Sequence, residues 1–390
     1  MATSGRSAII VGAGIGGLAT ALALQSTGWK VHVIERSGSA AAPGNGLSIW
    51  PNGTAALERL GLREAFDRIS LPVRGGALDL DGRPILELDQ PEVLDRYGRS
   101  VRTVHRADLT ALLAGALAVN TVHRGLAVAR FEPDARTSTV VLENRGQQSA
   151  DLVVGADGLY SLVRRTLIGG SAPRSAGITA FRAVCPAPGP DAAALPWGET
   201  WGPGAVFGIS PLKGNRIYWY GTISNAEFRS SSLPTLKAMA LDRFGHWNHG
   251  IAQLIGRTPE EAVMAHELFD RKPEPVWSGR SATLVGDAAH PMLPFLGQGA
   301  CQALEDAVAL ADALAAHGSV QEGLLAYDAE RVPRTARIVN RSRMVGRLAQ
   351  LERPGLRKAR NTALRILPRK LRLKQLDSVL GPAVPSLPAS

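Results

Sequence analysis

Two kinds of hydrophobic pattern alternate along the chain. Short, continuous apolar runs, several of them rich in β-branched residues, end at a glycine or an acidic residue, as strands buried in a parallel sheet do. These runs cover residues 7–11, 30–34, 151–155 and 281–285. Alanine-rich stretches at residues 18–26 and 301–315 have the composition of helices. Strands that alternate with helices predict an α/β fold with a parallel sheet.

Residues 73–100 and 176–277 follow a different pattern. Apolar and polar positions alternate there between turns, which is typical of an antiparallel sheet. The predicted elements are strands at residues 177–184, 200–202, 206–211 and 216–223, and a helix at residues 233–245. We therefore expect a second, antiparallel-sheet unit that is inserted at two places into the α/β unit.

The composition is that of a globular protein, with 45% hydrophobic residues among 390, and this length is typical of about two domains. No apolar run reaches the roughly 18 residues of a membrane-spanning helix. The first apolar run, Ala8–Val11, is too short for the core of a signal peptide. Cys185 and Cys301 are the only cysteines and cannot build a disulfide framework. We expect a cytoplasmic protein in a reducing compartment.

Positive charge is concentrated near the C-terminus. The formal net charge is +10, but residues 331–374 hold 15 Lys/Arg and one acid, which leaves −4 for the rest of the chain. Apolar residues recur in this segment at helix-like intervals, which favours helices that dock an apolar face and expose a basic one. Binding to anionic lipid or to nucleic acid is the alternative. Because no aromatic residues are interleaved to stack bases, we expect no nucleic-acid partner.

The strongest local signal lies between residues 7 and 35. The sequence G-A-G-I-G-G, from Gly12 to Gly17, separates a strand from a helix, and Glu35 ends the next strand. In such a unit Gly12 permits a tight turn, Gly14 lets the backbone approach a pyrophosphate, and Gly17 lets helix and strand pack closely. The helix N-terminus offers free N–H groups to phosphates, and Glu35 can accept hydrogen bonds from ribose hydroxyls. The unit predicts a dinucleotide site.

Two later segments extend this site. The run at 151–155 continues into the sequence G-A-D-G, and the run at 281–285 continues into G-D-A-A-H. The second of these leads to G-Q-G at residues 297–299, directly before a helix, where free N–H groups again favour an anion. A molecule with phosphates at one end and a polar ring system at the other would span both glycine-rich loops.

In order, the motifs GxGxxG…E, GADG…S..R and GDAAH…P..GQG resemble those of the group A flavoprotein monooxygenases, the aromatic hydroxylases of the p-hydroxybenzoate hydroxylase type. The resemblance covers nearly the whole chain, and residues 46–52 and 102–109 look most like the salicylate- and urate-hydroxylase branch. It implies a Rossmann-like, GR2-type FAD-binding domain with an inserted antiparallel-sheet substrate domain and C-terminal helices. The implied parts are an FAD-binding domain of residues 1–72, 101–175 and 278–331, a substrate domain of residues 73–100 and 176–277, and a C-terminal helical segment of residues 332–380.

The resemblance also implies roles for single residues. Glu35 would hold the FAD ribose with Arg36 beside the adenine, Arg106 would contact the pyrophosphate side, and Asp287 the ribityl or pyrophosphate part. Backbone N–H groups of residues 297–300 would face the flavin ring, where negative charge develops on reduction. The expected cofactor-binding residues are Gly12, Gly14, Ile15, Gly17, Glu35, Arg36, Ser48, Arg106, Val128, Asp157, Asp287, Pro294, Gly297, Gln298, Gly299 and Ala300.

Structural interpretations stand beside these roles. Arg106 could be an exposed charge at a helix start, and Asp287 could cap the turn that follows it. Asp157 with Gly158 could form an ordinary turn. His290 lies inside a motif that packs against the cofactor, so we expect a structural role for it. The eight histidines show no spacing that predicts a metal site.

The predicted strand at residues 216–223 carries the expected catalytic residues. Period-two alternation puts Arg216, Tyr218 and Tyr220 on one face, and the resemblance implies that Arg216 and Tyr218 look toward flavin and substrate. Ordinary half-buried strand aromatics are the alternative. The strand at 206–211 lacks the arginine that holds a carboxylate in benzoate hydroxylases, and an arginine for urate is missing there too. We therefore expect a larger, mostly apolar aromatic substrate.

The implied chemistry consumes NADH or NADPH and O2. The donor reduces the flavin, O2 adds to give a C4a-hydroperoxide, and its distal oxygen is transferred to an electron-rich aromatic or heteroaromatic ring. The protein would orient the substrate and exclude water. Three other flavoprotein classes compete with this reading. A halogenase would need a W-x-W-x-I-P sequence, which is missing, whereas an FAD-dependent reductase or epoxidase of an olefinic intermediate and a non-catalytic FAD-binding paralogue remain open.

Overall fold

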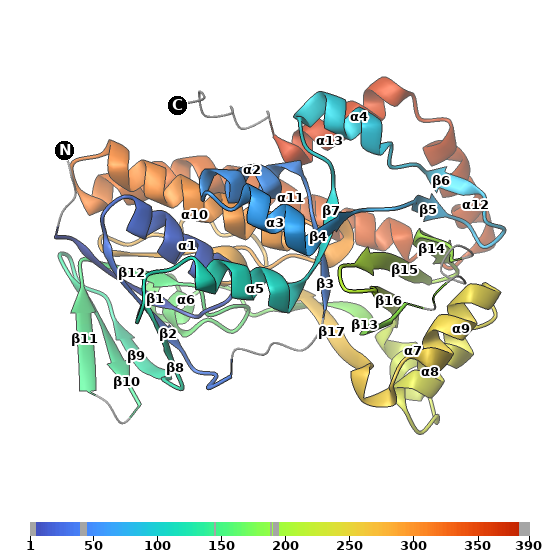
Figure 1. Ribbon diagram of the computed structural model, residues 1–390, viewed down its shortest axis with the longest axis horizontal. Coiled ribbons are helices and arrows are strands. Elements are labelled where there is room, and N and C mark those ends of the chain that lie inside the picture. Colours follow the sequence, from blue (N-terminus) through green and yellow to red (C-terminus); the bar gives the residue numbers. More distant parts are fainter. Residues whose placement is uncertain (1–4, 40–44, 144–145, 188, 190–194, 382–390) are drawn as a thin grey trace.

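Five parallel strands form the sheet that carries the first glycine-rich loop (Figure 1). The computed structural model describes residues 5–39, 45–143, 146–187, 189 and 195–381. In spatial order the strands are β18 (Ala282–Leu284), β12 (Leu152–Gly155), β1 (Ser7–Val11), β2 (Lys30–Glu35) and β8 (Val122–Arg124). All four strand pairs are parallel. The predicted α/β class with a parallel sheet is therefore confirmed.

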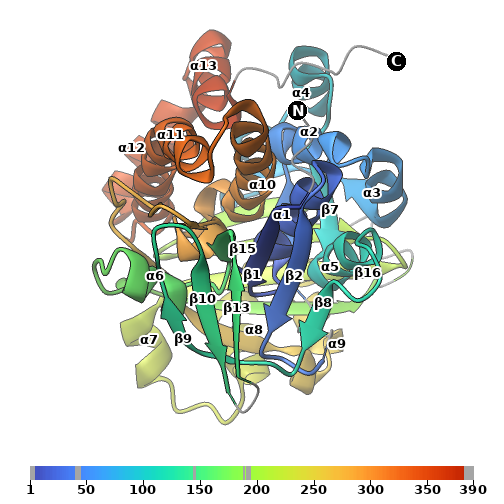
Figure 2. The same ribbon diagram turned by 90° about the vertical axis from the view of Figure 1, so that its left-hand side faces the viewer.

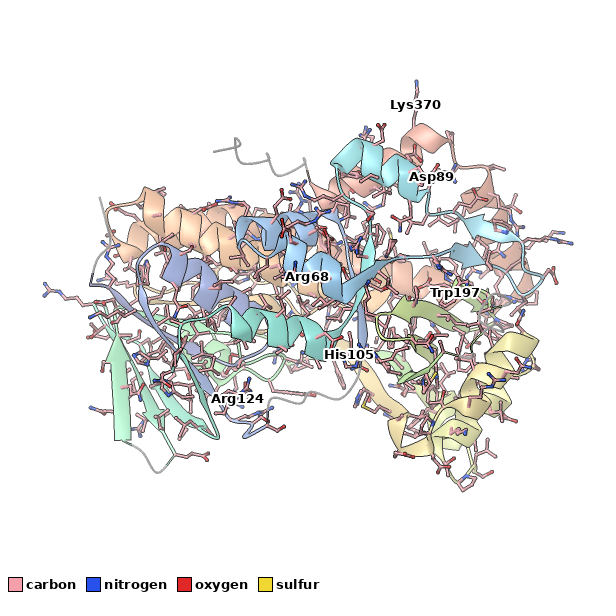
Figure 3. All side chains as sticks on the ribbon, viewed as in Figure 1. Arg68, Asp89, His105, Arg124, Trp197 and Lys370 are labelled. Carbon is pink, nitrogen blue, oxygen red and sulfur yellow. The ribbon has the colours of Figure 1, made fainter. Side chains whose placement is uncertain are left out.

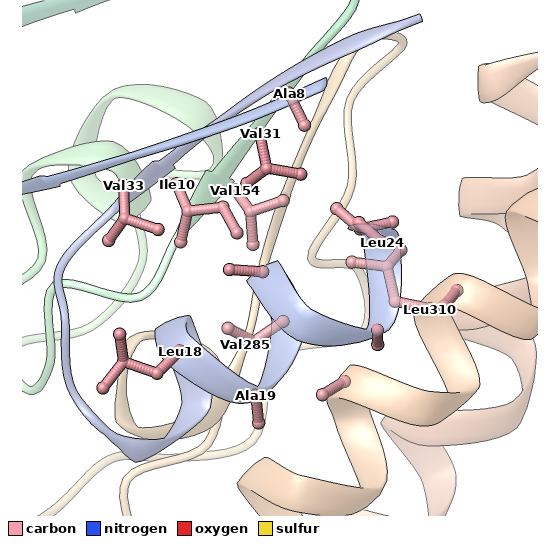
Figure 4. Close-up of a cluster of buried hydrophobic side chains, with 14 of the residues drawn as sticks. Ala8, Ile10, Leu18, Ala19, Leu24, Val31, Val33, Val154, Val285 and Leu310 are labelled. Atoms are coloured by element: carbon pink, nitrogen blue, oxygen red, sulfur yellow. The ribbon is translucent and has the colours of Figure 1, made fainter. Parts of the chain in front are cut away.

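Helix α1 (Ile15–Ser26) is enclosed between this sheet and helix α10 (Gly299–Ala316). Figure 4 shows Leu18 and Leu24 of α1 close to strand residues such as Ile10, with Leu310 of α10 nearby. These side chains are almost fully buried. Because α1 is apolar on nearly all sides, it has no face that solvates well and is stable only as a buried helix. Its N-terminus is thereby fixed relative to both glycine-rich loops.

A small antiparallel sheet and short helices complete the α/β half. The sheet comprises β9 (Val128–Glu132), β10 (Ser138–Leu142) and β11 (Gly146–Ala150), and it shares the core through Phe131 and Val140. A second small sheet comprises β3 (Gly46–Ile49), β7 (Arg102–His105) and β4 (Ser70–Pro72). The helices are α2 (Pro51–Arg59), α3 (Arg63–Ile69), α5 (Arg106–Gly115) and α6 (Leu162–Leu167).

Seven strands form the largest sheet, at the right in Figure 1. In spatial order they are β17 (Met264–Asp270), β13 (Arg174–Pro186), β16 (Arg216–Ser224), β15 (Ala205–Leu212), β14 (Gly198–Gly202), β5 (Gly76–Leu78) and β6 (Pro84–Leu86). Every pair is antiparallel except β14 with β5. The four predicted strands are all present as β13 to β16, and each starts or ends within a few residues of its prediction.

The two faces of this sheet have different partners. Helices α7 (Asn225–Ser230), α8 (Leu236–Phe244) and α9 (His249–Arg257) pack on its outer face, where Phe181, Phe207 and Trp219 form an apolar core. The inner face turns toward the α/β half and contacts Leu293 and Phe295 of that half. Since side chains alternate along each strand, the residues between the outer core positions must lie on the inner face.

The C-terminal part consists of helices. Helix α11 (Val320–Ala349) runs without a break past residue 332, where the C-terminal segment was expected to begin, and it contains Pro333. Helix α12 (Pro354–Arg365) packs beside β6, and α13 (Arg369–Leu380) lies beside α4 (Gln90–Tyr97). Figure 2 shows these helices on the same side of the molecule as α10. Among the described residues, no helix is both long and apolar enough to cross a bilayer.

Candidate cofactor and substrate site

The first glycine-rich loop has the geometry that its sequence predicts. Gly12 has a φ of +107°, a conformation that L side chains rarely adopt, and a Cβ there would lie 2.5 Å from the carbonyl oxygen of Ala156. A Cβ on Gly17 would lie only 2.0 Å from the carbonyl oxygen of Gly12. Gly14 is different, because a Cβ there meets no atom within 4 Å. Neighbouring backbone atoms therefore enclose the loop at Gly12 and Gly17, whereas the space beside Gly14 is open, as a phosphate-binding loop requires.

Glu35 lies directly beside this loop. Its carboxylate accepts hydrogen bonds from the backbone N–H of Ala13 at 2.8 Å and of Ser37 at 2.8 Å. Leu126 donates its N–H to the carbonyl of Glu35 at 3.0 Å, which brings the segment before Val128 to the same place. The predicted ribose and adenine contacts therefore converge at the end of β2, whereas the neighbouring Arg36 is exposed.

The second glycine-rich segment meets the first at the N-terminus of α1. A Cβ built on Gly16 would lie 3.3 Å from the Cβ of Ala303 and 3.9 Å from the Cα of Gly286. Asp287, in the short 3-10 turn Gly286–Ala288, is exposed although both of its neighbours are buried. The turn thus presents one carboxylate next to the phosphate-binding loop, where the sequence analysis expects it.

Buried side chains hold this turn from both sides. Asp306 accepts a hydrogen bond from the N–H of Gly286 at 2.9 Å and contacts Nε2 of His290 at 2.5 Å. The buried guanidinium of Arg164 donates to the carbonyls of Ala288 at 3.0 Å and Ala289 at 2.9 Å. The role expected for His290 is structural, and its buried contact with Asp306 supports that expectation.

A charged network continues from Asp306 through the core. Arg331 bonds Asp306 at 2.8 Å and Glu305 at 2.5 Å, and only 1% of its side chain is exposed. Glu305 also accepts from Asn52 Nδ2 at 2.6 Å. The same amide of Asn52 donates to Oε1 of Gln298 at 2.9 Å. Because its side chain is buried in this network, Gln298 can offer a cofactor only its backbone.

The loop before α10 opens onto the same space. The first N–H groups of a helix have no partner within it, and a Cβ built on Gly299 meets no atom within 4 Å. Gly297 has a φ of +61°, and a Cβ there would lie 2.7 Å from Nε1 of Trp50. Pro294 is exposed beside this loop, and Ala300 is half-buried. Two open helix N-termini, with Glu35 beside the first and Asp287 in the turn that meets it, fit an FAD molecule.

Other predicted residues have partners of their own. Asp157 accepts hydrogen bonds from Ser161 Oγ and from the N–H of Leu162 at 2.7 Å, so its carboxylate also caps the start of α6. Arg106 is the exposed first residue of α5, and its N–H donates to the carbonyl of Asn45 at 2.8 Å. Ser48 lies in β3, where its Cβ would be 3.7 Å from a Cβ on Gly297.

The inner face of the large sheet lies against β3. Tyr218 packs so closely on Gly46 that a Cβ there would lie 2.4 Å from the tyrosine ring. Tyr220 is on the same face, with a ring-centroid distance of 5.6 Å to Tyr218, and Trp219 packs in the outer core. The predicted alternation is therefore confirmed. Burial raises the pKa of Tyr218, although nearby Arg182 lowers it, so the phenol stays protonated near neutral pH.

Tyr218 and Tyr220 differ in their hydroxyl groups. The hydroxyl of Tyr220 donates to Glu199, which also accepts from Nε1 of Trp201 at 2.7 Å. Among the described residues, the hydroxyl of Tyr218 has no hydrogen-bond partner in the structure. Arg216, at the other end of this strand segment, bonds Oδ2 of Asp108 at 2.6 Å. It thereby ties β16 to α5.

Sequence reasoning missed the other polar groups of the inner face. Arg182 pairs with Tyr220 across β13 and β16, so both side chains lie on one face, and His266 of β17 joins them. Together with Glu199 they give this face several polar groups, whereas the expected substrate is a mostly apolar aromatic. The signal was present, because Arg182 stands between the apolar residues Phe181 and Ala183 in a predicted strand.

Known proteins are similar to this chain in sequence and fold. A family model described as "FAD binding domain" matches residues 6–342. The aurachin C monooxygenase/isomerase of Stigmatella aurantiaca is 34% identical, over 90% of this chain and 91% of its own. The 3-amino-4-hydroxybenzoate 2-monooxygenase of Streptomyces cremeus is 36% identical, over 86% and 85%. The structure of Klebsiella pneumoniae HpxO with FAD and uric acid has a TM-score of 0.89 at 25% identity, covering 98% of this chain and 99% of HpxO.

The match covers both glycine-rich loops and most of α11. The open space above Gly14 and Gly299 agrees with FAD as the cofactor. The chain therefore belongs to the FAD-binding domain family, and within it to the FAD-dependent monooxygenases of the aromatic-hydroxylase type.

Proposed function

We propose that this protein uses NADH or NADPH and O2 to hydroxylate an electron-rich aromatic or heteroaromatic small molecule. The observation that carries the proposal is the hydroxyl of buried Tyr218, which has no hydrogen-bond partner among the described residues and lies on the inner sheet face that packs on Gly46 of β3. The relatives support an aromatic substrate, since one is a 3-amino-4-hydroxybenzoate 2-monooxygenase and HpxO is solved with uric acid.

Bound FAD would supply the redox chemistry by accepting two electrons from the nicotinamide and activating O2. Gly12, Gly14 and Glu35 would hold its adenosine diphosphate part, and Asp287 its middle. The N–H groups at residues 297–300 would stabilise negative charge on the ring. The turn that carries Asp287 is held by buried Asp306 and Arg164, so this turn would need little reorganisation during turnover.

The substrate would lie between this loop and the inner sheet face. Tyr218 would hydrogen-bond a ring oxygen or nitrogen of the substrate and so fix which carbon meets the activated oxygen. Arg182, which has no ion-pair partner among the described residues, would favour a phenolate or another electron-rich, partly anionic ring. Leu293 and Phe295 would exclude water from the space between.

The test is a turnover assay with the FAD-loaded protein, a panel of phenols, aminophenols and hydroxylated heteroaromatics, and 18O-labelled O2. We expect a substrate-stimulated uptake of O2, an equal consumption of NADH or NADPH, and one 18O atom in the product. An oxygen-independent reduction of an olefin would instead identify a reductase. The absence of stimulated O2 uptake with every electron-rich ring would overturn the proposal.

Replacement of Tyr218 by phenylalanine should uncouple the reaction. The ring keeps its packing on Gly46, but the substrate loses one hydrogen bond, which is about 1.5 kcal/mol or more for a charged partner. We expect a fall of about tenfold in kcat/KM for product formation. Hydrogen peroxide should rise as a fraction of NAD(P)H consumed, and peroxide assays alongside product chromatography measure both.

Tyr220→Phe is the matched control, because the hydroxyl of Tyr220 is already bonded to Glu199. We expect this variant to shift the thermal unfolding temperature more than the coupling ratio. The same loss of coupling in both variants would argue against a specific contact between Tyr218 and the substrate.

Exchanging the charges of Arg216 and Asp108 tests whether Arg216 only links β16 to α5 or also contacts the substrate. Each single reversal, Arg216→Asp or Asp108→Arg, should lower kcat/KM several-fold because two like charges then face each other across about 3 Å. If Arg216 acts only by positioning β16, the double variant recovers most of the activity. An activity that stays low in the double variant, with normal thermal stability, would place Arg216 in contact with substrate.

A further inference from the structure

Helix α12 carries an apolar stripe on its outward side. Leu356, Ala359, Ala363 and Ile366 follow each other at intervals of three and four residues, so they share one face of the helix. All four are exposed, Leu356 to 51% and Ile366 to 74%. Scattered exposed apolar residues are common on proteins, but a continuous stripe of them indicates a contact surface.

The side of α12 next to this stripe anchors the helix and so fixes where the stripe faces. Leu364 packs in the apolar cluster that contains Trp201 and Ala349. The guanidinium of Arg360 lies 4.9 Å above the Trp201 ring. Arg365 bonds Asp79 at 2.5 Å. The helix is therefore anchored on the large sheet, and Figure 1 shows it at the outer edge of the molecule.

The surroundings of the stripe are strongly basic. Residues 353–374 contain nine Lys/Arg and no acidic residue. Arg353, Lys358, Lys370 and Lys374 are exposed, and within the described part of the chain none of them has an ion-pair partner in the structure. Figure 3 shows Lys370 pointing away from the protein.

We propose that α12 and the start of α13 bind the surface of an anionic lipid bilayer. Leu356 and Ile366 would enter the boundary between headgroups and acyl chains, and the lysines would contact the lipid phosphates. An apolar stripe bordered by basic residues has this affinity because apolar burial and charge attraction add. Each basic residue near such a surface strengthens binding several-fold.

Charge and size favour a bilayer over other occupants. A second copy of this chain would bring two basic faces together, and two leucine-sized side chains with two alanines fall well short of the roughly 800 Å² that each partner buries in a stable dimer. A nucleic acid would be attracted by the charge, but it gives the apolar stripe no partner, and residues 353–374 contain no aromatic side chain for stacking.

The experiment is co-sedimentation of the FAD-loaded, full-length protein with vesicles of phosphatidylcholine alone or with roughly 30% phosphatidylglycerol. We expect at least tenfold stronger partitioning to the anionic vesicles, weakened by high salt. A Leu356→Ser/Ile366→Ser variant and a Lys358→Glu/Lys370→Glu/Lys374→Glu variant should each lose at least 90% of it.

Matched changes elsewhere serve as controls. Lys30→Glu/Arg136→Glu/Lys272→Glu changes the net charge equally at other exposed sites, and Val119→Ser/Leu325→Ser removes two other exposed apolar side chains. Both should bind vesicles like the parent. FAD absorbance and thermal unfolding verify that every variant is folded.

Three results would overturn the proposal. One is equal partitioning to neutral and anionic vesicles or to neither. A second is that the two α12 variants bind the anionic vesicles as strongly as their control variants do. The third is a doubling of mass in solution that Leu356→Ser/Ile366→Ser abolishes, which would assign the stripe to a dimer instead.

Discussion

Gly14→Val is expected to abolish FAD binding while the protein stays folded. Gly14 has an extended backbone, with φ −74° and ψ 179°, that valine adopts readily. A side chain there enters the open space above the loop, where nothing lies within 4 Å, and so displaces the pyrophosphate. We expect the Kd for FAD to rise at least 100-fold, or about 2.7 kcal/mol, as measured by quenching of FAD fluorescence on titration.

Gly17→Val separates this effect from damage to the fold. A Cβ at Gly17 collides with the carbonyl of Gly12 at 2.0 Å, so helix α1 must move away from β1. This variant should lose thermal stability as well as FAD, whereas Gly14→Val should unfold like the parent. The comparison must use the FAD-free proteins, since bound cofactor raises the stability of the folded state. FAD binding of normal affinity by Gly14→Val would contradict the assigned geometry.

The local parts of the site could be predicted from the sequence. The roles of Gly12, Gly14 and Gly17 depend on backbone geometry within one turn, and the spacing of three glycines is sufficient to specify it. Likewise, period-two alternation gave the correct face to Tyr218 because the rule applies within a single strand. Such features are encoded by neighbours in the chain.

The buried charged network of Asn52, Glu305, Asp306 and Arg331 could not be predicted in this way. Asn52 and Glu305 are 253 residues apart, and Arg331 reaches Asp306 from a third helix. No periodicity or motif links residues at such separations. In the sequence, each of them looks like an ordinary polar or charged surface residue. Only the packing of α10 against α2 and α11 brings them together, and only their burial reveals that they act as a unit.

The place of Arg182 on the inner face could not be predicted for a related reason. The arginine missing from the strand at 206–211 was sought on that strand alone, but Arg182 reaches the inner face from β13, which pairs with β16 in register. Predicting this requires the strand order of the sheet, and antiparallel order is not contained in the pattern of any one strand. The FAD-binding loops, in contrast, need only one strand–loop–helix unit each.

The largest loss of stability is expected for Arg331→Met. Arg331 is almost completely buried between Glu305 and Asp306, and methionine fills the space of its stem but removes from two buried carboxylates a cation that both contact. Breaking a buried ion pair in this way costs about 3–5 kcal/mol. We expect the free energy of unfolding to fall by about that amount in urea titrations. FAD affinity should fall as well, since Asp306 holds the N–H of Gly286.

The pH dependence provides the decisive check on this mechanism. Burial alone would raise the pKa of Asp306, but His290 and Arg331 lower it from 3.8 to about 2. In the parent, this carboxylate therefore contributes stability above about pH 4 and loses it as the pH falls through 2. In Arg331→Met the carboxylate keeps His290 and the N–H of Gly286 but loses the contribution of Arg331, so its pKa rises from its lowered value and less stability is gained as the pH increases from about 2 to about 4. The deficit should therefore be larger at about pH 5 than at about pH 2.

Arg334→Met is the matched control for the charge. Arg334 also bonds Glu305, but 18% of its side chain is exposed, so water can take its place. We expect it to cost about 1 kcal/mol, with little change between the two pH values. If Arg331→Met and Arg334→Met were equally destabilising, or if the Arg331→Met deficit did not depend on pH, the buried carboxylates would not be the cause. A network that holds the Gly286–Ala288 turn through buried charges must respond to pH once one of its cations is removed.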